Sequence, residues 1–274
     1  MLNFGEAFQG EEHQSFKWVN GSRAALLIHG FPGTPAEMRP IAEILFKEGW
    51  TVQAPLLPGL GIEIDKLAEK THEEWLEAVR IVFEELAAEH ETVVVIGYSM
   101  GAALAICLAK EYAIEGLILF APFMEIQNIL WNALPLIKLV APRIKIFRMM
   151  KPDFSDPQTR AGILQFMPNI DLDDEQVQEA ILNFEVPVKM FNEIRLIGQR
   201  AQKTISQITA PTLIIQGSLD ELVKPEITRK FWGRFATDVQ YLEVESTHEI
   251  MKVEPQLWSQ ITDTVLNFTR EIEA

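Results

Sequence analysis

Cysteine is almost absent from this chain of 274 residues, which contains only Cys107. A single cysteine excludes an internal disulfide bond. The absence of disulfides is typical of proteins kept in a reducing compartment. No apolar run reaches the roughly 20 residues that span a bilayer as a helix. The first residues, MLNFGEAFQGEEH, lack the basic and apolar regions of a signal peptide. We therefore expect a cytoplasmic protein with no stable membrane insertion.

Basic residues are also scarce relative to acidic ones. The chain has 24 lysines and arginines against 39 aspartates and glutamates, and its formal net charge is −15. Nucleic acid is disfavoured as a partner, because its binding depends on neutralising phosphates with basic side chains. An anionic membrane surface is disfavoured for the same reason. A small molecule is the expected partner, and the sequence does not define an oligomeric state.

Hydrophobic residues make up 48% of the chain, which is enough for a sizeable core. Short apolar segments alternate with segments whose apolar residues recur at helical spacing. This alternation predicts an α/β fold with a mostly parallel sheet covered by helices on both faces. The clearest strand segments are 51–55, 92–97, 116–122, 211–217 and 239–245.

The character of the chain changes after Pro122. Residues 123–205 are rich in Met, Phe and Pro. Their pattern is typical of several separate helices, and no strand is obvious. The alternation of strands and helices then returns. We interpret residues 1–122 and 206–274 as a core domain and residues 123–205 as a helical cap over one edge of its sheet.

One serine stands where an apolar strand turns into a helix. Ser99 lies in GYSMG, after the run VVVI and before the run AALAICLA. The pattern G-x-S-x-G at such a junction places the serine at the tip of a sharp turn, with its side chain pointing into a cleft. Gly97 and Gly101 are small because neighbouring backbone passes close to them. The free N–H groups at the start of the helix face any oxyanion that forms beside Ser99.

A serine hydroxyl needs a base within hydrogen-bond reach to act as a nucleophile. Of the five histidines, His248 is the best candidate, because it follows the last strand in VESTHEI. His13 has no evident partner, while His72 and His90 fall on or beside a surface helix and are expected to be solvated. His29 precedes a Gly-Pro loop, and we expect it to fix that loop by hydrogen bonding rather than to act as a base.

The imidazole in turn needs an acceptor that fixes its tautomer. Asp220 follows the preceding strand, in IIQGSLDELV, and completes the order Ser, Asp, His that is usual on this kind of sheet. Glu221 is a weaker candidate, whereas Glu125 also follows a strand and stays open as an alternative acid. Cys107 falls inside the helix after the serine, and we expect a small buried residue there rather than a nucleophile.

Five segments carry a resemblance to a known superfamily: LLIHGFPGTP (26–35), APLLPGLG (54–61), GYSMGA (97–102), ITAPTLIIQGSLDELV (208–223) and STHEI (246–250). Over nearly its whole length the chain resembles the α/β-hydrolases, and among them the bacterial carboxylesterases and monoacylglycerol-lipase-like enzymes. The resemblance implies the α/β-hydrolase fold, with a helical cap inserted after the sixth strand.

The resemblance also implies roles for particular residues. The backbone N–H groups of Phe31 and Met100 are expected to form the oxyanion hole. The serine, histidine and aspartate would hydrolyse an ester through an acyl-enzyme, without a metal or a cofactor. The chain departs from the family at two positions, with Leu60 where a histidine is frequent and Ala102 where a second glycine is frequent.

The expected substrate is a carboxylic ester with a short-to-medium acyl chain, such as a monoacylglycerol. Three apolar residues of the cap, Trp131, Met190 and Phe191, are expected to line the acyl pocket. Gly162 and Gly198 are candidate flexible points. The same triad serves thioesterases, amidases, C–C hydrolases and cofactor-free haloperoxidases, so these alternatives stay open. A ligand-binding receptor without turnover is a further alternative.

Overall fold

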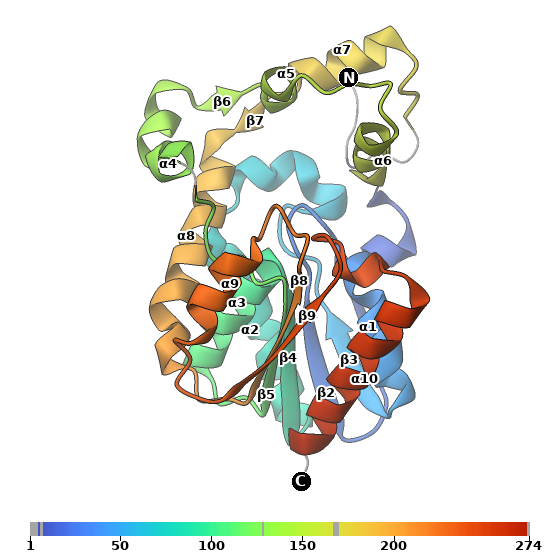
Figure 1. Ribbon diagram of the computed structural model, residues 1–274, viewed down its shortest axis with the longest axis vertical. Helices are drawn as coiled ribbons and strands as arrows, with labels where there is room; N and C mark the ends of the chain where they lie inside the picture. The colour runs from blue at the N-terminus through green and yellow to red at the C-terminus, as the bar shows by residue number, and fades with distance from the viewer. Residues whose placement is uncertain (1–4, 6–7, 128, 167–169, 273–274) are drawn as a thin grey trace.

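A seven-stranded sheet lies at the centre of the computed structural model, which describes residues 5, 8–127, 129–166 and 170–272 (Figure 1). The strand order is β1-β3-β2-β4-β5-β8-β9. β1 pairs antiparallel with β3, and all other neighbouring pairs are parallel. The strands are β1 (Phe16–Trp18), β2 (Arg23–Ile28), β3 (Trp50–Ala54), β4 (Thr92–Tyr98), β5 (Gly116–Phe120), β8 (Thr212–Gly217) and β9 (Val239–Val244).

Helices cover both faces of this sheet, as the sequence predicts (Figure 1). One face packs against α1 and α10, and the other packs against α2, α3 and α9. The strands β2, β4, β5 and β8 are therefore buried on both sides, which explains their mostly apolar sequences. The helices are α1 (Arg39–Lys47), α2 (His72–Glu89), α3 (Met100–Glu111), α9 (Pro225–Trp232) and α10 (Pro255–Ile272).

Local sequence accounts for these helices. In α2, Trp75, Val79 and Phe83 recur at helical spacing and form a buried stripe. Thr71 directly precedes the helix as its N-cap, and its hydroxyl accepts a hydrogen bond from the Glu74 N–H. The Glu74 carboxylate accepts the Thr71 N–H in return, so two backbone donors at the helix start are satisfied.

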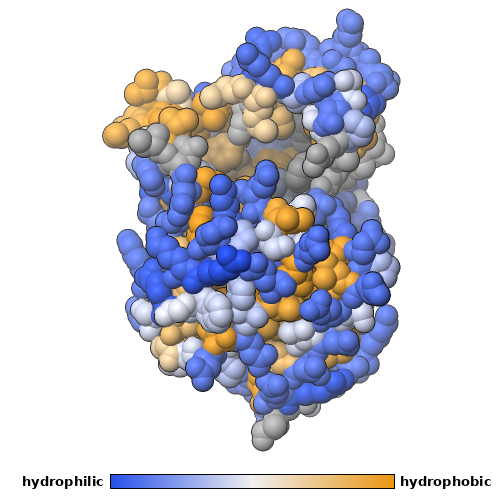
Figure 2. All heavy atoms as spheres, in the orientation of Figure 1, coloured by the Kyte–Doolittle hydropathy of each residue, from blue (hydrophilic) through white to orange (hydrophobic). Residues whose placement is uncertain are grey.

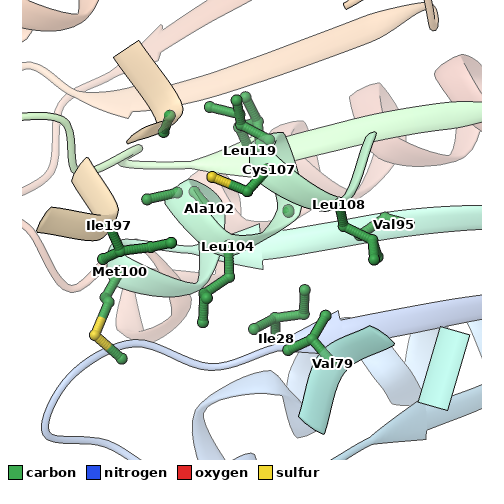
Figure 3. Close-up of a cluster of buried hydrophobic side chains, with 14 of the residues drawn as sticks. Ile28, Val79, Val95, Met100, Ala102, Leu104, Cys107, Leu108, Leu119 and Ile197 are labelled. Carbon is green, nitrogen blue, oxygen red and sulfur yellow. The ribbon is translucent and has the colours of Figure 1, made fainter. Parts of the chain in front are cut away.

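α3 is the most deeply buried helix of the core. Every residue from Met100 to Leu108 is buried. The helix contacts β4 and β5 of the sheet, and it is covered by α2 and by α8 (Val188–Thr204). Figure 3 shows its side chains packed among residues of these neighbours and of β2, including Ile28, Val79, Val95, Leu119 and Ile197.

The segment between β5 and β8 forms the upper part of the molecule in Figure 1. It leaves the sheet after its fifth strand in chain order. The expected insertion point, after a sixth strand, is wrong by this count, because the part before β2 adds only the single strand β1 to the sheet. The helices of the segment are α4 (Ile129–Val140), α5 (Ile146–Met150), α6 (Pro157–Phe166), α7 (Glu175–Asn183) and α8.

Two features of this segment (residues 121–211, here called the cap segment) differ from expectation. It contains a pair of two-residue antiparallel strands, β6 (Arg143–Ile144) and β7 (Val186–Pro187), which are too short to leave a pattern in the sequence. Its last helix, α8, also descends along the core, and Ile197 and Ala201 belong to the same hydrophobic cluster as α3.

The surface is hollowed between the cap segment and the top of the core (Figure 2). The carboxyl ends of the parallel strands β4, β5, β8 and β9 point to this side of the molecule (Figure 1). In open α/β sheets, binding sites form at such strand ends. No helix within the described residues is both long and apolar enough to cross a membrane.

Candidate active site

Ser99 occupies the turn between β4 and α3, where its backbone has φ 54° and ψ −116°. Few residues other than glycine adopt a positive φ, and they persist only where surrounding contacts hold them. Here the Ser99 N–H donates to the Phe120 carbonyl at 2.9 Å, and the Ser99 carbonyl accepts the Phe123 N–H at 3.1 Å. The end of β5 and the segment after it therefore hold the serine in its strained conformation.

The two glycines of the turn allow close backbone packing, as predicted. A Cβ atom at Gly101 would overlap the carbonyl oxygen of Ile28, and one at Gly97 would overlap the backbone of Ala102. The absence of a side chain at Gly101 lets β2 approach the start of α3, and its absence at Gly97 lets the end of β4 pass close to Ala102.

The structure brings Ser99, His248 and Asp220 together in one hydrogen-bonded chain. The Nε2 atom of His248 lies 3.0 Å from Ser99 Oγ, and its Nδ1 atom lies 2.7 Å from Asp220 Oδ2. The carboxylate can only accept from Nδ1–H, so Nε2 is left to accept the serine proton. This is the tautomer that a general base beside a serine requires.

The loops after β8 and β9 position the aspartate and the histidine. The Asp220 side chain is fully buried, and its Oδ1 accepts the N–H groups of Leu222 at 2.9 Å and Val223 at 2.8 Å. The Leu219 N–H donates to the Ser246 carbonyl at 2.9 Å and so joins the two loops. The remaining Asp220 oxygen is thereby left to face the imidazole.

Tyr98 also contacts the histidine, and sequence reasoning did not single it out. Its hydroxyl donates to the His248 carbonyl at 2.8 Å, and the two rings stack with centroids 5.3 Å apart. The only sequence signal for this role is the position directly before Ser99.

The loop after β2 (residues 30–34, here called the oxyanion loop) lies against the serine. A Cβ atom at Gly30 would lie 3.2 Å from Ser99 Cβ, which makes a larger residue unfavourable there. The helix α3 begins with Met100, so its first N–H groups also face this region. Within the described part of the chain, the Phe31 and Met100 N–H groups have no hydrogen-bond acceptor.

His29 holds the oxyanion loop rather than contacting the serine. Its Nε2 accepts the Leu57 N–H at 3.1 Å, so Nδ1 carries the proton and donates to the Gly30 carbonyl at 2.9 Å. The residue is fully buried, and burial lowers its pKa to about 4. The structural role expected for His29 agrees with these contacts.

The rival residues lie in other environments. Glu125 accepts a hydrogen bond from Gln202 at 3.2 Å, not from His248. Cys107 is buried inside α3, and burial raises the pKa of its thiol to about 12. The prediction from the sequence that His72 is solvated is wrong, because its Nδ1 lies 2.6 Å from the carboxylate of the buried Glu193 in α8.

The three candidate pocket residues lie near the junction of the cap segment and the core. Trp131 packs edge-on against Phe123, with ring centroids 5.9 Å apart. Met190 is buried, and Phe191 is partly buried against the same hydrophobic cluster. Part of their surface thus serves the packing of the protein itself. Within the described residues, no group of three His, Cys, Asp or Glu side chains is placed to hold a metal ion.

The sheet order, the helical layers and solved structures of the same architecture define the class: the protein has the α/β-hydrolase fold. A family model described as serine aminopeptidase, S33, matches residues 21–256. The chain belongs to this family of hydrolases.

Individual relatives share only a modest sequence identity with this chain. The chain is 24% identical over 243 residues to a carboxylesterase of Bacillus subtilis, covering 86% of this chain and 88% of the relative. It is 26% identical over 242 residues to a thermostable monoacylglycerol lipase of Bacillus sp., covering 86% of each.

Solved structures match over a similar extent. A structure from a study of the metagenome-derived lipolytic enzymes LipS and LipT aligns with a TM-score of 0.75 at 20% identity, covering 95% of this chain and 98% of the other. The Paleococcus ferrophilus monoacylglycerol lipase aligns with a TM-score of 0.70 at 18% identity, covering 94% and 98%.

Proposed function

We propose that this protein is a serine hydrolase of carboxylic esters, in which Ser99 is the nucleophile, His248 the general base and acid, and Asp220 the residue that orients the imidazole. The observation that carries the proposal is the hydrogen-bonded chain from Ser99 Oγ through His248 to Asp220, with distances of 3.0 Å and 2.7 Å. The names of the two Bacillus relatives, a carboxylesterase and a monoacylglycerol lipase, support an ester as the substrate.

Acylation begins when Ser99 Oγ attacks the carbonyl carbon of the ester. The Oγ proton passes to His248 Nε2, and the carbonyl electrons move onto oxygen to form a tetrahedral oxyanion. Asp220 stabilises the resulting imidazolium, since its buried carboxylate faces Nδ1–H. The oxyanion then collapses, the bond to the alcohol breaks, and the alcohol leaves with the proton from Nε2.

Deacylation repeats these steps with water. His248 takes a proton from water as the water oxygen attacks the acyl carbon. The second tetrahedral species then collapses, the bond to Ser99 Oγ breaks, His248 Nε2 returns the proton to Oγ, and the carboxylic acid leaves. In both steps the N–H groups of Phe31 and Met100 would donate to the oxyanion. Preorganised donors of this kind are each worth about 10²–10³ in rate.

The substrate class that we propose is an ester with a short-to-medium acyl chain, such as a monoacylglycerol. The aromatic and sulfur-containing side chains of Trp131, Met190 and Phe191 lie where the cap segment meets the core and would contact the acyl chain. Because the family model is described as an aminopeptidase, amide substrates belong in the same assay.

The test is hydrolysis of p-nitrophenyl esters from acetate to palmitate, together with aminoacyl p-nitroanilides. We expect ester turnover that peaks at one chain length and falls by at least about 10³-fold in Ser99→Ala and in His248→Ala. Asp220→Asn should lose about 10²–10⁴-fold, because the wrong histidine tautomer is then favoured. The matched control Glu125→Gln should stay within about twofold of wild type, since Glu125 contacts Gln202 instead.

Several outcomes would contradict this proposal. Faster turnover of the anilides than of the esters would make the enzyme an amidase. Ligand binding without turnover of any substrate would favour a receptor.

For the pocket residues, Trp131→Ala and Phe191→Ala should shift the preferred chain length, whereas Leu139→Ala, at a side chain 75% exposed on α4, should not.

A further inference from the structure

A glutamate side chain holds the oxyanion loop from behind. Glu37 lies in the short helix η3 (Pro35–Met38) that follows the loop, and its Oε2 accepts the Gly30 N–H at 3.1 Å. Gly33 lies directly against the same carboxyl group, because a Cβ atom at that position would overlap it. The loop from Gly30 to Gly33 therefore wraps around the Glu37 carboxyl group.

The hydrogen bond from Gly30 to Glu37 restrains a residue whose backbone is otherwise unusually flexible. A glycine is favoured at position 30, because a Cβ atom there would lie 3.2 Å from Ser99 Cβ and 3.3 Å from the Tyr98 carbonyl oxygen, which is tighter than ordinary van der Waals contact. A glycine, however, has more backbone freedom than any other residue. The direction of the next N–H group, that of Phe31, is then fixed only if both peptide groups around Gly30 are held.

Both peptide groups are held, and by different side chains. The peptide that joins Gly30 to Phe31 has its carbonyl bound by the His29 ring at 2.9 Å. The peptide that joins His29 to Gly30 has its N–H bound by Glu37 at 3.1 Å. These two hydrogen bonds define the orientation of the two consecutive peptide planes that lead into the Phe31 N–H.

The environment of Glu37 is not that of an ordinary surface glutamate. The side chain is partly buried, and burial raises its pKa to about 7 against the opposing effect of the Gly30 N–H. The charged and titratable groups that interact with it are Tyr98, His248, Glu249 and Lys252. Among the described residues Glu37 forms no ion pair, so the Gly30 N–H is its principal polar contact.

We propose that Glu37 is a positioning residue of the oxyanion loop, which aims the Phe31 N–H at the oxyanion by holding the Gly30 N–H. This inference rests on the ester hydrolysis proposed above. The acceptor matters here rather than the charge, because an ionised carboxyl, a protonated carboxyl and an amide can each accept this hydrogen bond. The contribution belongs to the transition state, since a ground-state carbonyl depends less on the oxyanion donors.

The experiment compares Glu37→Gln, Glu37→Ala and Glu37→Met with Glu43→Ala, which changes an exposed glutamate on α1. We expect kcat to fall about tenfold in the alanine and methionine variants, with KM changed less than about twofold. The glutamine variant should recover kcat to within about threefold of wild type, and Glu43→Ala should match wild type. Affinity for a boronic acid, which forms a tetrahedral adduct with the serine, should fall with kcat.

The variants are chosen so that each result is informative. The methionine variant keeps the volume of the side chain, so it tests the acceptor even if the alanine variant unfolds; thermal melting identifies folded variants. Equal losses in the glutamine and methionine variants, a rise of KM at constant kcat, or wild-type kcat in the methionine variant would each overturn the inference. Full ester hydrolysis by Ser99→Ala would instead overturn the proposed function, whatever the Glu37 variants do.

Discussion

Tyr98 and His248 are 150 positions apart in the chain, yet the Tyr98 hydroxyl donates a hydrogen bond of 2.8 Å to the His248 carbonyl and the two rings stack. Tyr98 also precedes Ser99 directly. Ser99 and His248 are therefore connected twice, once by their own contact of 3.0 Å and once through the tyrosine. The second connection acts on the backbone of His248 and leaves both ring nitrogens available.

Replacing Tyr98 by phenylalanine should weaken this second connection without removing the ring. We expect kcat for ester hydrolysis to fall about three- to tenfold and the free energy of unfolding to fall by about 1 kcal/mol, the usual contribution of one hydrogen bond. Steady-state kinetics and urea denaturation measure the two effects. Tyr241→Phe is the matched control, because Tyr241 binds Glu243 instead. Unchanged kcat in the Tyr98 variant would show that this bond does not position His248.

The glycine after the serine should be intolerant of even one methyl group. Gly101→Ala places a Cβ atom onto the Ile28 carbonyl oxygen, which is backbone and cannot rotate away. We expect a loss of on the order of 3 kcal/mol in the free energy of unfolding, at the upper end for overpacking. At Gly233, which has open space around it and φ −66°, the same substitution should be neutral or slightly stabilising. Chemical denaturation of both variants checks this, and equal effects would argue against the close approach of β2 to α3.

The strained backbone of Ser99 predicts that glycine stabilises the protein more than alanine at this position, which is the reverse of their usual order in a helix. At φ 54°, Ser99→Gly should be more stable than Ser99→Ala by about 1 kcal/mol, because relief of strain exceeds the entropic cost of glycine. At Ala109, in the regular part of α3, Ala→Gly should destabilise by about 1 kcal/mol. Thermal and urea unfolding of the two Ser99 variants, with Ala109→Gly as the reference, provide the measurement. If Ser99→Ala proves the more stable, the turn stores no strain.

His29 should make the fold sensitive to acid. Its pKa is about 4 in the folded protein against 6.5 in the unfolded chain, so the unfolded state binds more protons between these values. Stability is then fully present above about pH 6.5 and is lost as the pH falls toward 4, by about 3 kcal/mol in total. Urea denaturation from pH 4.5 to 8 should show a shallower dependence in His29→Gln, whose amide cannot take up a proton. Parallel curves for the two proteins would contradict this assignment.

The residues that sequence reasoning located share one property: each is marked by a local pattern. Ser99 lies in a five-residue motif, and Asp220 and His248 each lie in the segment that follows a strand. Parallel strands end at one edge of the sheet, so residues after successive strands are neighbours. The distances among these three side chains follow from that topology.

The residues that were missed or misjudged depend on contacts that no local pattern records. Glu37 falls in a segment with helical spacing, where a glutamate is expected to face solvent, and its side chain instead turns back toward Gly30. His72 was expected to be solvated because it begins a surface helix, but its partner Glu193 lies 121 positions later. Gly198 was expected to be a flexible point, yet a Cβ atom there would overlap the Met124 carbonyl oxygen. That glycine permits close packing of α8.

The continuity of α8 has a consequence for protein engineering. One uninterrupted helix of 17 residues carries Met190 in its first turn and Ile197 and Ala201 against α3 further on. A chimaera that exchanged residues 123–205 as a block would also remove the helix that covers α3, which begins directly after Ser99. The junction for transplanting a new cap therefore belongs within α8, ahead of Ile194, so that the recipient keeps its own last turns of this helix.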